Sequence, residues 1–430
     1  MNRREFLTSS AAAIAVLPLD RGPQAAAQFR SNGLNWTAIR RLFPLEEGLV
    51  HMSGFYLASH AAPVQAAIDA HRRGLDGEPL HYVSANNLKN EAAVTAAAAQ
   101  YMGVSSSEIA LTDSTTMGLG LLLTGLKLQP GDEVVTSTHD HFSTEMSLQM
   151  CAERTGATIK RIPLYRSIGS VSAAELVNSV RDGVTPRTRF VMLTWVHSGT
   201  GLKLPIRSIA EAIDEENRRR TENERVRLLV DGVHGFGVEP TPVSELGCDA
   251  FVAGTHKWIF GPRGTGVAWA RTDTWAQVWP SIPSWYGPHW QSWIGWREKE
   301  TMPVGMLMTP GGFHSFENRW ALADAFKLHL SWGRQAIADR IHALTAATKE
   351  GLRRMKHVTL HTPTDRALSS GIICFDVAGM TPQQVVAKLR ERGVVASTTP
   401  YRTIHARLSP SLLTLEADVE RTLEVVRSLV

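Results

Sequence analysis

The chain has 430 residues, of which 43% are hydrophobic and 20% charged, and its formal net charge is +4. This length accommodates a large and a smaller domain, and the composition is ordinary for a globular protein. The arginines of residues 218–227 alternate with glutamates, which favours a solvated surface and argues against nucleic-acid binding. No stretch of about 18 apolar residues occurs, so we predict no membrane insertion. Cys151, Cys248 and Cys374 are too widely spaced for a disulfide framework or a zinc site, and we predict no metal site.

Residues 1–27 have the pattern of a targeting segment. Arg3-Arg4 begins a twin-arginine motif, an apolar run follows from residue 11 to 19, and Ala25-Ala26-Ala27 offers small residues for cleavage. We therefore expect export of the folded protein to the periplasm by the twin-arginine route. An ordinary secretory signal or a disordered start are the alternatives.

After an arm over residues 28–52, helical and strand signals alternate, which predicts an α/β domain with a mostly parallel sheet over residues 53–310. In chain order the expected elements are a helix at 91–102, a strand at 109–112, a helix at 115–126, and strands at 134–136, 190–194, 227–230 and 250–254.

The pattern changes after Gly311-Gly312. A long helix at 317–332 leads into a second helix through the 340s. A strand at 371–377, a helix at 382–392, a strand at 394–398 and a last helix from 416 follow. Residues 311–430 are therefore predicted to form a small C-terminal α+β domain.

Three polar segments follow predicted strands, at the sheet edge where open α/β folds bind ligands. In the first, Thr115 and Thr116 begin a helix whose N–H groups favour an anion, although such residues often serve only as a helix cap. In the second, Asp231 ends a buried strand and needs a partner for its charge. In the third, Lys257 precedes a glycine-rich turn, where partial burial lowers the pKa of its amine.

These segments resemble the class V aminotransferase family of fold-type I enzymes, which depend on pyridoxal 5′-phosphate (PLP). The resemblance covers about residues 45–430 and rests on Asp231, His234 and Thr255-His256-Lys257. It implies a large domain with a mostly parallel seven-stranded sheet and PLP held by Lys257 as a Schiff base. Asp231 would pair with the pyridine nitrogen and His234 with the phenolic oxygen. The phosphate would be held by Thr115, Thr116, Thr255 and His256.

The resemblance also implies further site residues. His141, or failing that His139, would stack on the cofactor ring, and Ser198 would lie near it. His314 or Ser315 would cap the phosphate of a neighbouring subunit in a homodimer with shared active sites. Arg407 would bind the substrate carboxylate, with Arg402 as the competing candidate.

One departure from the family concerns sulfur chemistry. Cysteine desulfurases of this family carry a nucleophilic cysteine on a loop shortly before the carboxylate-binding arginine, and residues 397–406 contain none. Cys374 lies within an apolar predicted strand, so we expect it to be buried. Sulfur transfer through an enzyme thiol is therefore not expected.

The export signal is a second departure. It resembles that of exported members of the isopenicillin N epimerase-like branch, including a periplasmic enzyme that tailors the siderophore pyoverdine. We therefore expect an enzyme acting on an α-amino acid, or on the amino-acid end of a secreted peptide or siderophore. Transamination is the first expectation, with β-elimination or epimerisation as alternatives and a non-catalytic PLP-fold binding protein as a distant one.

Six tryptophans fall within residues 275–296. Tryptophans at this density form either a core or subunit interface, or an aromatic wall for a bulky substrate. The sequence leaves both alternatives open.

Overall fold

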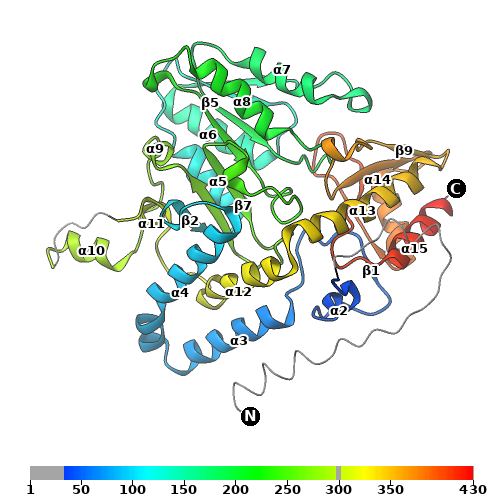
Figure 1. Ribbon diagram of the computed structural model, residues 1–430, viewed down its shortest axis with the longest axis horizontal. Coiled ribbons are helices and arrows are strands. Elements are labelled where there is room, and N and C mark those ends of the chain that lie inside the picture. Colours follow the sequence, from blue (N-terminus) through cyan, green and yellow to red (C-terminus); the bar gives the residue numbers. More distant parts are fainter. Residues whose placement is uncertain (1–32, 297–301, 430) are drawn as a thin grey trace. The chain divides into compact units, whose positions relative to one another are not determined.

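The computed structural model of the protein describes residues 33–296 and 302–429 (Figure 1). The predicted export signal, residues 1–27, lies outside the described residues, as does the beginning of the predicted arm. Within the described ranges, no helix combines the length and the apolar character needed to cross a lipid bilayer.

Seven strands form the larger sheet: β2 (Ile109–Thr112), β3 (Glu133–Ser137), β4 (Thr158–Ile162), β5 (Thr188–Thr194), β6 (Arg227–Asp231), β7 (Ala250–Gly254) and β8 (Gly266–Ala270). Their order in the sheet is β2-β8-β7-β6-β5-β3-β4. Strands β4, β3, β5, β6 and β7 pair in parallel, and β8 runs antiparallel to β7 and β2. β6 and β7 are buried along their whole length, as expected of parallel strands covered on both faces. The predicted fold class is therefore confirmed.

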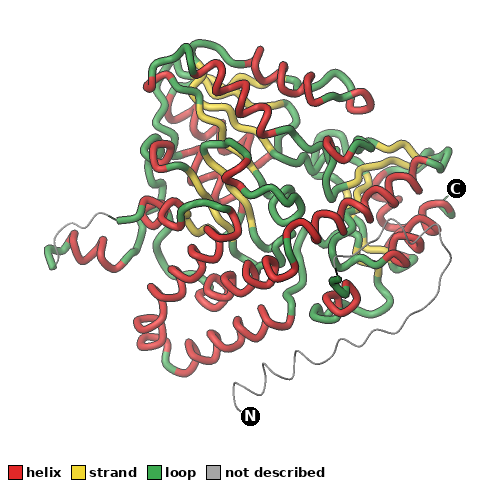
Figure 2. The backbone as a smooth tube through the Cα atoms, viewed as in Figure 1, coloured by secondary structure: helices red, strands yellow, loops and turns green. Residues whose placement is uncertain are grey.

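Ten helices pack around this sheet or extend from it in the described residues: α3 (Ala62–Gly77), α4 (Pro79–Met102), α5 (Thr115–Thr124), α6 (Phe142–Thr155), α7 (Ala173–Gly183), α8 (Ile206–Asn217), α9 (Thr272–Trp275), α10 (Gly287–Trp293), α11 (Val304–Met308) and α12 (Phe316–Trp332). Val191 and Val230 share a core with residues of α4, α7, α8 and α12. Met192 and Leu229 share another core with α5 and α6. Because successive strand residues point to opposite faces, helices cover both sides of the sheet (Figure 2).

A smaller sheet lies in the C-terminal part and is antiparallel, in the order β12 (Ser397–Thr398), β13 (Ala406–Leu408), β10 (Ile373–Val377) and β9 (Val358–Leu360). Phe375 and Leu408 on one face pack with α13 (Arg334–Arg353), α14 (Pro382–Glu391) and α15 (Glu416–Arg427). The alternation of strand side chains puts Asp376 and Arg407 on the other face. A small C-terminal α+β part is thus confirmed.

The N-terminal segment of the described chain joins this smaller part. After α2 (Trp36–Arg40), strand β1 (Val50–His51) pairs in parallel with β11 (Val394–Val395). The predicted domain boundary at residue 311 precedes α12, and α12 packs mainly on α3 and α4 beside the larger sheet (Figure 1).

Several elements differ from the sequence expectations. β4 and β8 are not predicted, because β4 is a partly exposed edge strand with lysine and arginine, and β8 follows directly on a glycine-rich turn. The helix expected from residue 91 begins at Pro79, since proline is tolerated in a first helical turn. The strand expected at 394–398 is divided between β11 and β12, which belong to different sheets.

Candidate active site

A cavity of about 360 Å³ lies where β5, β6 and β7 end and where α5 and α6 begin. This volume is within the range of small-molecule sites. The lining includes these residues predicted from the sequence: Thr115, Thr116, His141, Ser198, Asp231, His234, His256, Lys257 and Arg407. Phe55, Tyr56, Ser114, Ser143, Thr194, Pro400 and Tyr401 line it as well.

Lys257 stands in a turn that follows β7. The Phe260 N–H donates to the Lys257 carbonyl at 3.1 Å, and Phe260 itself adopts a positive φ of 56°, which is uncommon outside glycine. Burial lowers the pKa of the Lys257 amine to about 8, although the nearby Asp231 carboxylate opposes this shift. The neutral, nucleophilic form of the amine is therefore a minor form at neutral pH, but far more abundant than in an ordinary lysine.

Asp231 ends β6 and is only 3% exposed. Its Oδ1 accepts a hydrogen bond from the Val233 N–H at 3.1 Å, and Oδ2 accepts none from the described residues. Burial raises the pKa of the Asp231 carboxyl to about 6, against the lowering effects of that bond and of Lys257. A cationic partner at Oδ2 would keep this carboxylate ionised.

His234 presents an N–H to the cavity. Its Nδ1 lies 3.4 Å from the indole Nε1 of Trp258, which can only donate, so Nδ1 is the acceptor. Burial, followed by the charge of Lys257, holds the pKa of His234 well below its usual value. The neutral ring therefore carries its hydrogen on Nε2, which lies 3.4 Å from Lys257 Nζ.

The N-terminus of α5 lines one end of the cavity. Ser114 caps the helix by accepting from the Met117 N–H, and the first two helical residues are Thr115 and Thr116. Thr115 Oγ1 accepts from the Gly254 N–H at 2.8 Å, and Thr116 Oγ1 lies 3.0 Å from Ser143 Oγ. Backbone N–H groups, the helix dipole and these hydroxyls together suit a phosphate.

Thr255 does not join this cradle. Its side chain is fully buried, and its hydroxyl lies 2.6 Å from that of Thr265 instead of lining the cavity. The predicted phosphate contact of the Thr255 side chain is therefore not supported by the geometry. His256 does line the cavity, and its Nδ1 faces the Thr265 carbonyl at 3.3 Å, which makes Nδ1 the donor there.

The rings of His141 and Tyr401 are neighbours in the lining of the cavity. His141 caps α6 by accepting from the Ser143 N–H through Nδ1, and its ring lies edge-on to that of Tyr401 at 5.9 Å. The Tyr401 hydroxyl lies 3.0 Å from Ser198 Oγ. Burial lowers the pKa of His141, and so do the charges of Lys257 and Arg407. The fallback residue His139 stacks on Tyr165 and does not line the cavity.

Arg407 reaches the cavity from β13. Its Nη1 donates to the Ser198 carbonyl at 3.1 Å, its Nε donates to Ser397 Oγ at 3.2 Å, and its guanidinium carbon lies 4.3 Å from the Phe55 ring. Nη2 donates to none of the described residues. The competing candidate, Arg402, is exposed and lies outside the lining.

No cysteine lines the cavity. Cys151, Cys248 and Cys374 are all buried, and burial raises the pKa of the Cys374 thiol to about 12. The expectation that Cys374 is a core residue is therefore confirmed.

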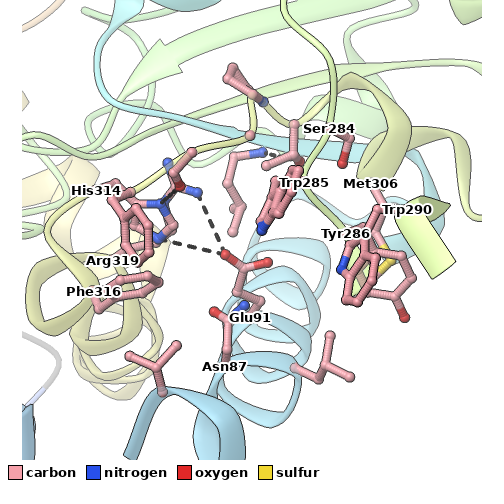
Figure 3. Close-up of a pocket in the computed structure, with 18 of the residues that line it drawn as sticks. Asn87, Glu91, Ser284, Trp285, Tyr286, Trp290, Met306, His314, Phe316 and Arg319 are labelled. Atoms are coloured by element: carbon pink, nitrogen blue, oxygen red, sulfur yellow. Dashed lines mark hydrogen bonds and ion pairs between the residues drawn. The ribbon is translucent and has the colours of Figure 1, made fainter. Parts of the chain in front are cut away.

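A second cavity, of about 370 Å³, contains His314 (Figure 3). One side of this cavity is lined by the aromatic side chains of Trp285, Tyr286 and Trp290. At its polar end, Glu91 Oε1 lies 3.7 Å from His314 Nε2 and 3.5 Å from Arg319 Nη1. Ser315 is exposed and stands immediately before α12, as its N-cap residue.

His314 and Ser315 therefore do not line the Lys257 cavity of their own chain, and their predicted role toward a neighbouring subunit stays a prediction. The tryptophans of residues 275–296 differ in exposure: Trp275 is buried in the core, whereas Trp285 and Trp293 are largely exposed. The structure thus leaves both the interface and the substrate-wall alternatives open for the exposed ones.

The lining fits PLP. The hydroxyl of Thr194 is buried without a hydrogen-bond partner among the described residues, and Thr194 pairs in register with Asp231. No cation in the described part of the chain bonds to Asp231 Oδ2, Lys257 offers an amine of lowered pKa, and the N-terminus of α5 offers N–H donors to an anion. A pyridinium nitrogen, an aldehyde and a phosphate are the three groups of PLP that match these features.

The sequence profile of the class-V aminotransferase family matches residues 68–407. The chain belongs to this family. The family is PLP-dependent, so the predicted cofactor is confirmed.

Relatives with assigned names include cysteine desulfurases. A probable cysteine desulfurase of Vibrio cholerae serotype O1 is 26% identical over 387 residues, covering 82% of this chain and 88% of that protein. A probable cysteine desulfurase of Mycolicibacterium paratuberculosis is 26% identical over 403 residues, covering 89% of this chain. The chain spans only 54% of the length of that second relative.

Solved structures show the same fold. A mutant of C-DES with glycine covalently linked to its PLP cofactor has a TM-score of 0.80 at 24% identity, covering 90% of this chain and 99% of that one. The complex of the cystine C–S lyase C-DES with its product cysteine persulfide has a TM-score of 0.78 at 24% identity, covering 89% and 98% of the two chains. These similarities confirm the fold-type I architecture.

Sequence reasoning missed Tyr401 and the aromatic residues Phe55 and Tyr56. Tyr401 lies within residues 397–406, the segment that the family resemblance compares with the nucleophile loop of cysteine desulfurases, and the absence of a cysteine there is the one sequence signal for this loop. Phe55 and Tyr56 offered no such signal, because they come from a segment far from every motif.

Proposed function

We propose that this protein transfers the amino group of an α-amino acid, using PLP held at Lys257. The observation that carries the proposal is that Lys257, Asp231 and Arg407 line one cavity to which no cysteine contributes. This set can bind a carboxylate and remove a proton from the adjacent carbon, and it offers no thiol to accept sulfur.

Each residue has a role that follows from its surroundings. Arg407 holds the substrate carboxylate through Nη2, which has no partner among the described residues. PLP, when bound, supplies an electron sink for the electrons left at the α-carbon. Lys257, whose amine is released when the substrate amino group takes its place, would then remove the α-proton and return it to a different carbon. The Asp231 carboxylate would keep the proton on the pyridine nitrogen, and His234 would donate its Nε2–H to the cofactor.

β-Elimination is the second candidate, and the similarity to C-DES favours it, because that protein is named a cystine C–S lyase. Loss of a leaving group at the β-carbon begins with the same α-proton removal and needs no enzyme thiol. The desulfurase route through an enzyme cysteine is not supported, since residues 397–406 contain none and Cys374 is buried.

One experiment separates these reactions. The PLP-loaded protein is incubated in D₂O with a panel of amino acids that includes cystine, with and without a keto-acid acceptor. We expect deuterium at the α-carbon and amino transfer that requires the acceptor. Pyruvate and ammonia released without an acceptor would instead identify β-elimination, inverted configuration would identify epimerisation, and no α-exchange from any amino acid would contradict all three.

The substrate and the site of action extend this proposal. The twin-arginine motif at Arg3-Arg4 and the resemblance to exported relatives support action in the periplasm, on an amino acid or on the amino-acid end of a secreted peptide or siderophore. Replacing Arg3 and Arg4 by lysine is expected to retain the folded, yellow precursor in the cytoplasm. Normal periplasmic levels of the double variant would contradict this route.

We also propose a homodimer with shared active sites. Trp285, Trp293 and Phe313 are largely exposed, which is unusual for such large apolar side chains unless they are covered. Apart from Lys257 and Arg407, no lysine or arginine among the described residues lines the cavity. A neighbouring subunit that brings His314 or Ser315 to the phosphate would complete the cradle. Sedimentation equilibrium tests the dimer, and a monomer with full activity would contradict it.

A further inference from the structure

Two histidines and an aspartate meet on the smaller sheet. His361 follows β9, Asp376 lies on β10, and His405 immediately precedes β13. His361 Nε2 lies 2.7 Å from Asp376 Oδ2, and His405 Nδ1 lies 3.0 Å from the same oxygen. One ligand atom from each residue lies within 4.8 Å of the other two, and the imidazole rings are tilted by 30° with their centroids 3.9 Å apart. The two imidazole nitrogens thus converge on one carboxylate.

These side chains are the ligand types that imidazole-preferring metals select. Two imidazoles and a carboxylate suit Zn²⁺, with water in the remaining position. Ligands about 2.0 Å from a tetrahedral ion stand roughly 3.3 Å apart. The 2.7 Å and 3.0 Å nitrogen–oxygen separations would therefore widen by about 0.6 Å and about 0.3 Å to admit the ion. The His361, His405 and Asp376 side chains are 22%, 11% and 35% exposed. An ion can therefore enter from solvent and retain water.

The cluster lies at the base of the loop over residues 400–404. The Thr399 N–H donates to the His405 carbonyl at 2.9 Å, and the His405 N–H donates to Thr399 Oγ1 at 2.9 Å, so this pair closes the loop. The loop carries Tyr401, which lines the Lys257 cavity. His405 precedes Arg407 by two residues along the chain, and because strand side chains alternate, the two project from the same face.

We propose that His361, Asp376 and His405 form a binding site for a divalent transition-metal ion, with Zn²⁺ as the preferred ion. The ion joins the end of the 400–404 loop to the central strand β10. In doing so it restrains the loop that holds Tyr401 against the active site. This site is separate from the PLP chemistry and does not depend on the proposed reaction.

The competing arrangement is a hydrogen-bonded cluster without metal, in which each imidazole donates one N–H to Asp376. Both arrangements need the same three residues, so stability alone does not separate them. Two observations distinguish the metal site from the metal-free cluster: stoichiometric, saturable metal binding, and a metal-dependent change in the 400–404 loop.

The test uses the untagged, PLP-loaded full chain after dialysis against EDTA. Calorimetric titration with ZnCl₂ is expected to show about one ion bound per chain, with binding weakened at least about tenfold in His361→Gln and Asp376→Asn. His357→Gln is the matched control, because His357 lies in the same small part of the chain and bonds to the Val426 carbonyl instead. Circular dichroism of each variant checks folding.

A second measurement uses the unmodified protein and does not rely on variants. Hydrogen exchange of the backbone over residues 400–405 is expected to slow when ZnCl₂ is added and to recover with EDTA. The absence of saturable binding, or wild-type affinity in both ligand variants, would overturn the site. Binding without any change in exchange would overturn the restraint on the loop.

Discussion

Truncating Arg407 tests the assignment of the substrate carboxylate site. The residue is 3% exposed, its guanidinium lies 4.3 Å from the Phe55 ring, and it already donates to the Ser198 carbonyl. A carboxylate bound there lies in a partly dry cleft, where removing one side of a hydrogen-bonded charge pair costs about 2–5 kcal/mol. Because about 1.4 kcal/mol corresponds to tenfold, Arg407→Ala is expected to weaken amino-acid binding by roughly 30-fold to several-thousand-fold.

The assay titrates the PLP-loaded variant with an amino acid and follows the cofactor absorbance at equilibrium. The spectrum before addition is expected to match that of the unmodified protein, because Arg407 is placed at the substrate. Arg407→Lys is expected to recover only part of the affinity, since an ammonium cannot form two parallel bonds to a carboxylate. Arg407→Met keeps an apolar stem against Phe55 and separates the loss of charge from the loss of packing.

Arg402→Ala is the matched control, because Arg402 lies nearby in the sequence but is exposed and outside the cavity. We expect it to bind amino acids normally. If Arg402→Ala is impaired while Arg407→Ala is not, the carboxylate site has been assigned to the wrong arginine.

Three further predictions concern the cofactor residues and the fold. Asp231→Asn is expected to retain PLP but to lower kcat by on the order of 10³-fold or more, because an amide holds the pyridine proton poorly; unchanged kcat would contradict this role. Because the pKa of Lys257 is lowered to about 8, its reactive neutral form increases as the pH rises through that value. The rate of covalent PLP attachment to the cofactor-free protein should follow this rise, and a midpoint near that of an ordinary lysine would refute the shift. Gly232→Ala would place a Cβ 1.9 Å from the buried Phe251 ring and is expected to destabilise the protein by about 1–3 kcal/mol in urea unfolding. Gly120→Ala meets no atom within 4 Å and is the control, so equal urea midpoints for the two variants would count against the packing argument.

The sequence predicts the large sheet well because its central strands are continuous apolar runs that end in polar motifs. β6 and β7 are of this kind, and their apolar runs therefore locate Asp231, at the end of β6, and Lys257, just after β7. β4 has no such continuous apolar run, because an edge strand with one exposed side mixes charged and apolar residues. The sequence therefore does not predict it.

Side-chain direction is harder to predict than position. Thr255 and His256 are adjacent in the motif, yet His256 lines the cavity and Thr255 turns to Thr265. No local pattern distinguishes them, since the turn after β7 sets the direction of each side chain.

Long-range clusters lie beyond sequence reasoning altogether. His361, Asp376 and His405 are brought together only by the antiparallel pairing of β9, β10 and β13. Their spacing of 15 and 29 residues matches no short metal motif. Tyr401 reaches Ser198 in the same way, because the 400–404 loop lies against the segment that follows β5.

The most direct test of the central claim is to locate the cofactor attachment. The purified yellow protein is reduced with borohydride, digested and analysed by mass spectrometry, with Lys257→Ala treated in parallel. We predict that the pyridoxyl group is found on Lys257 and that the alanine variant carries none. A pyridoxyl group on another lysine, or undiminished labelling of the variant, would contradict the account of this site.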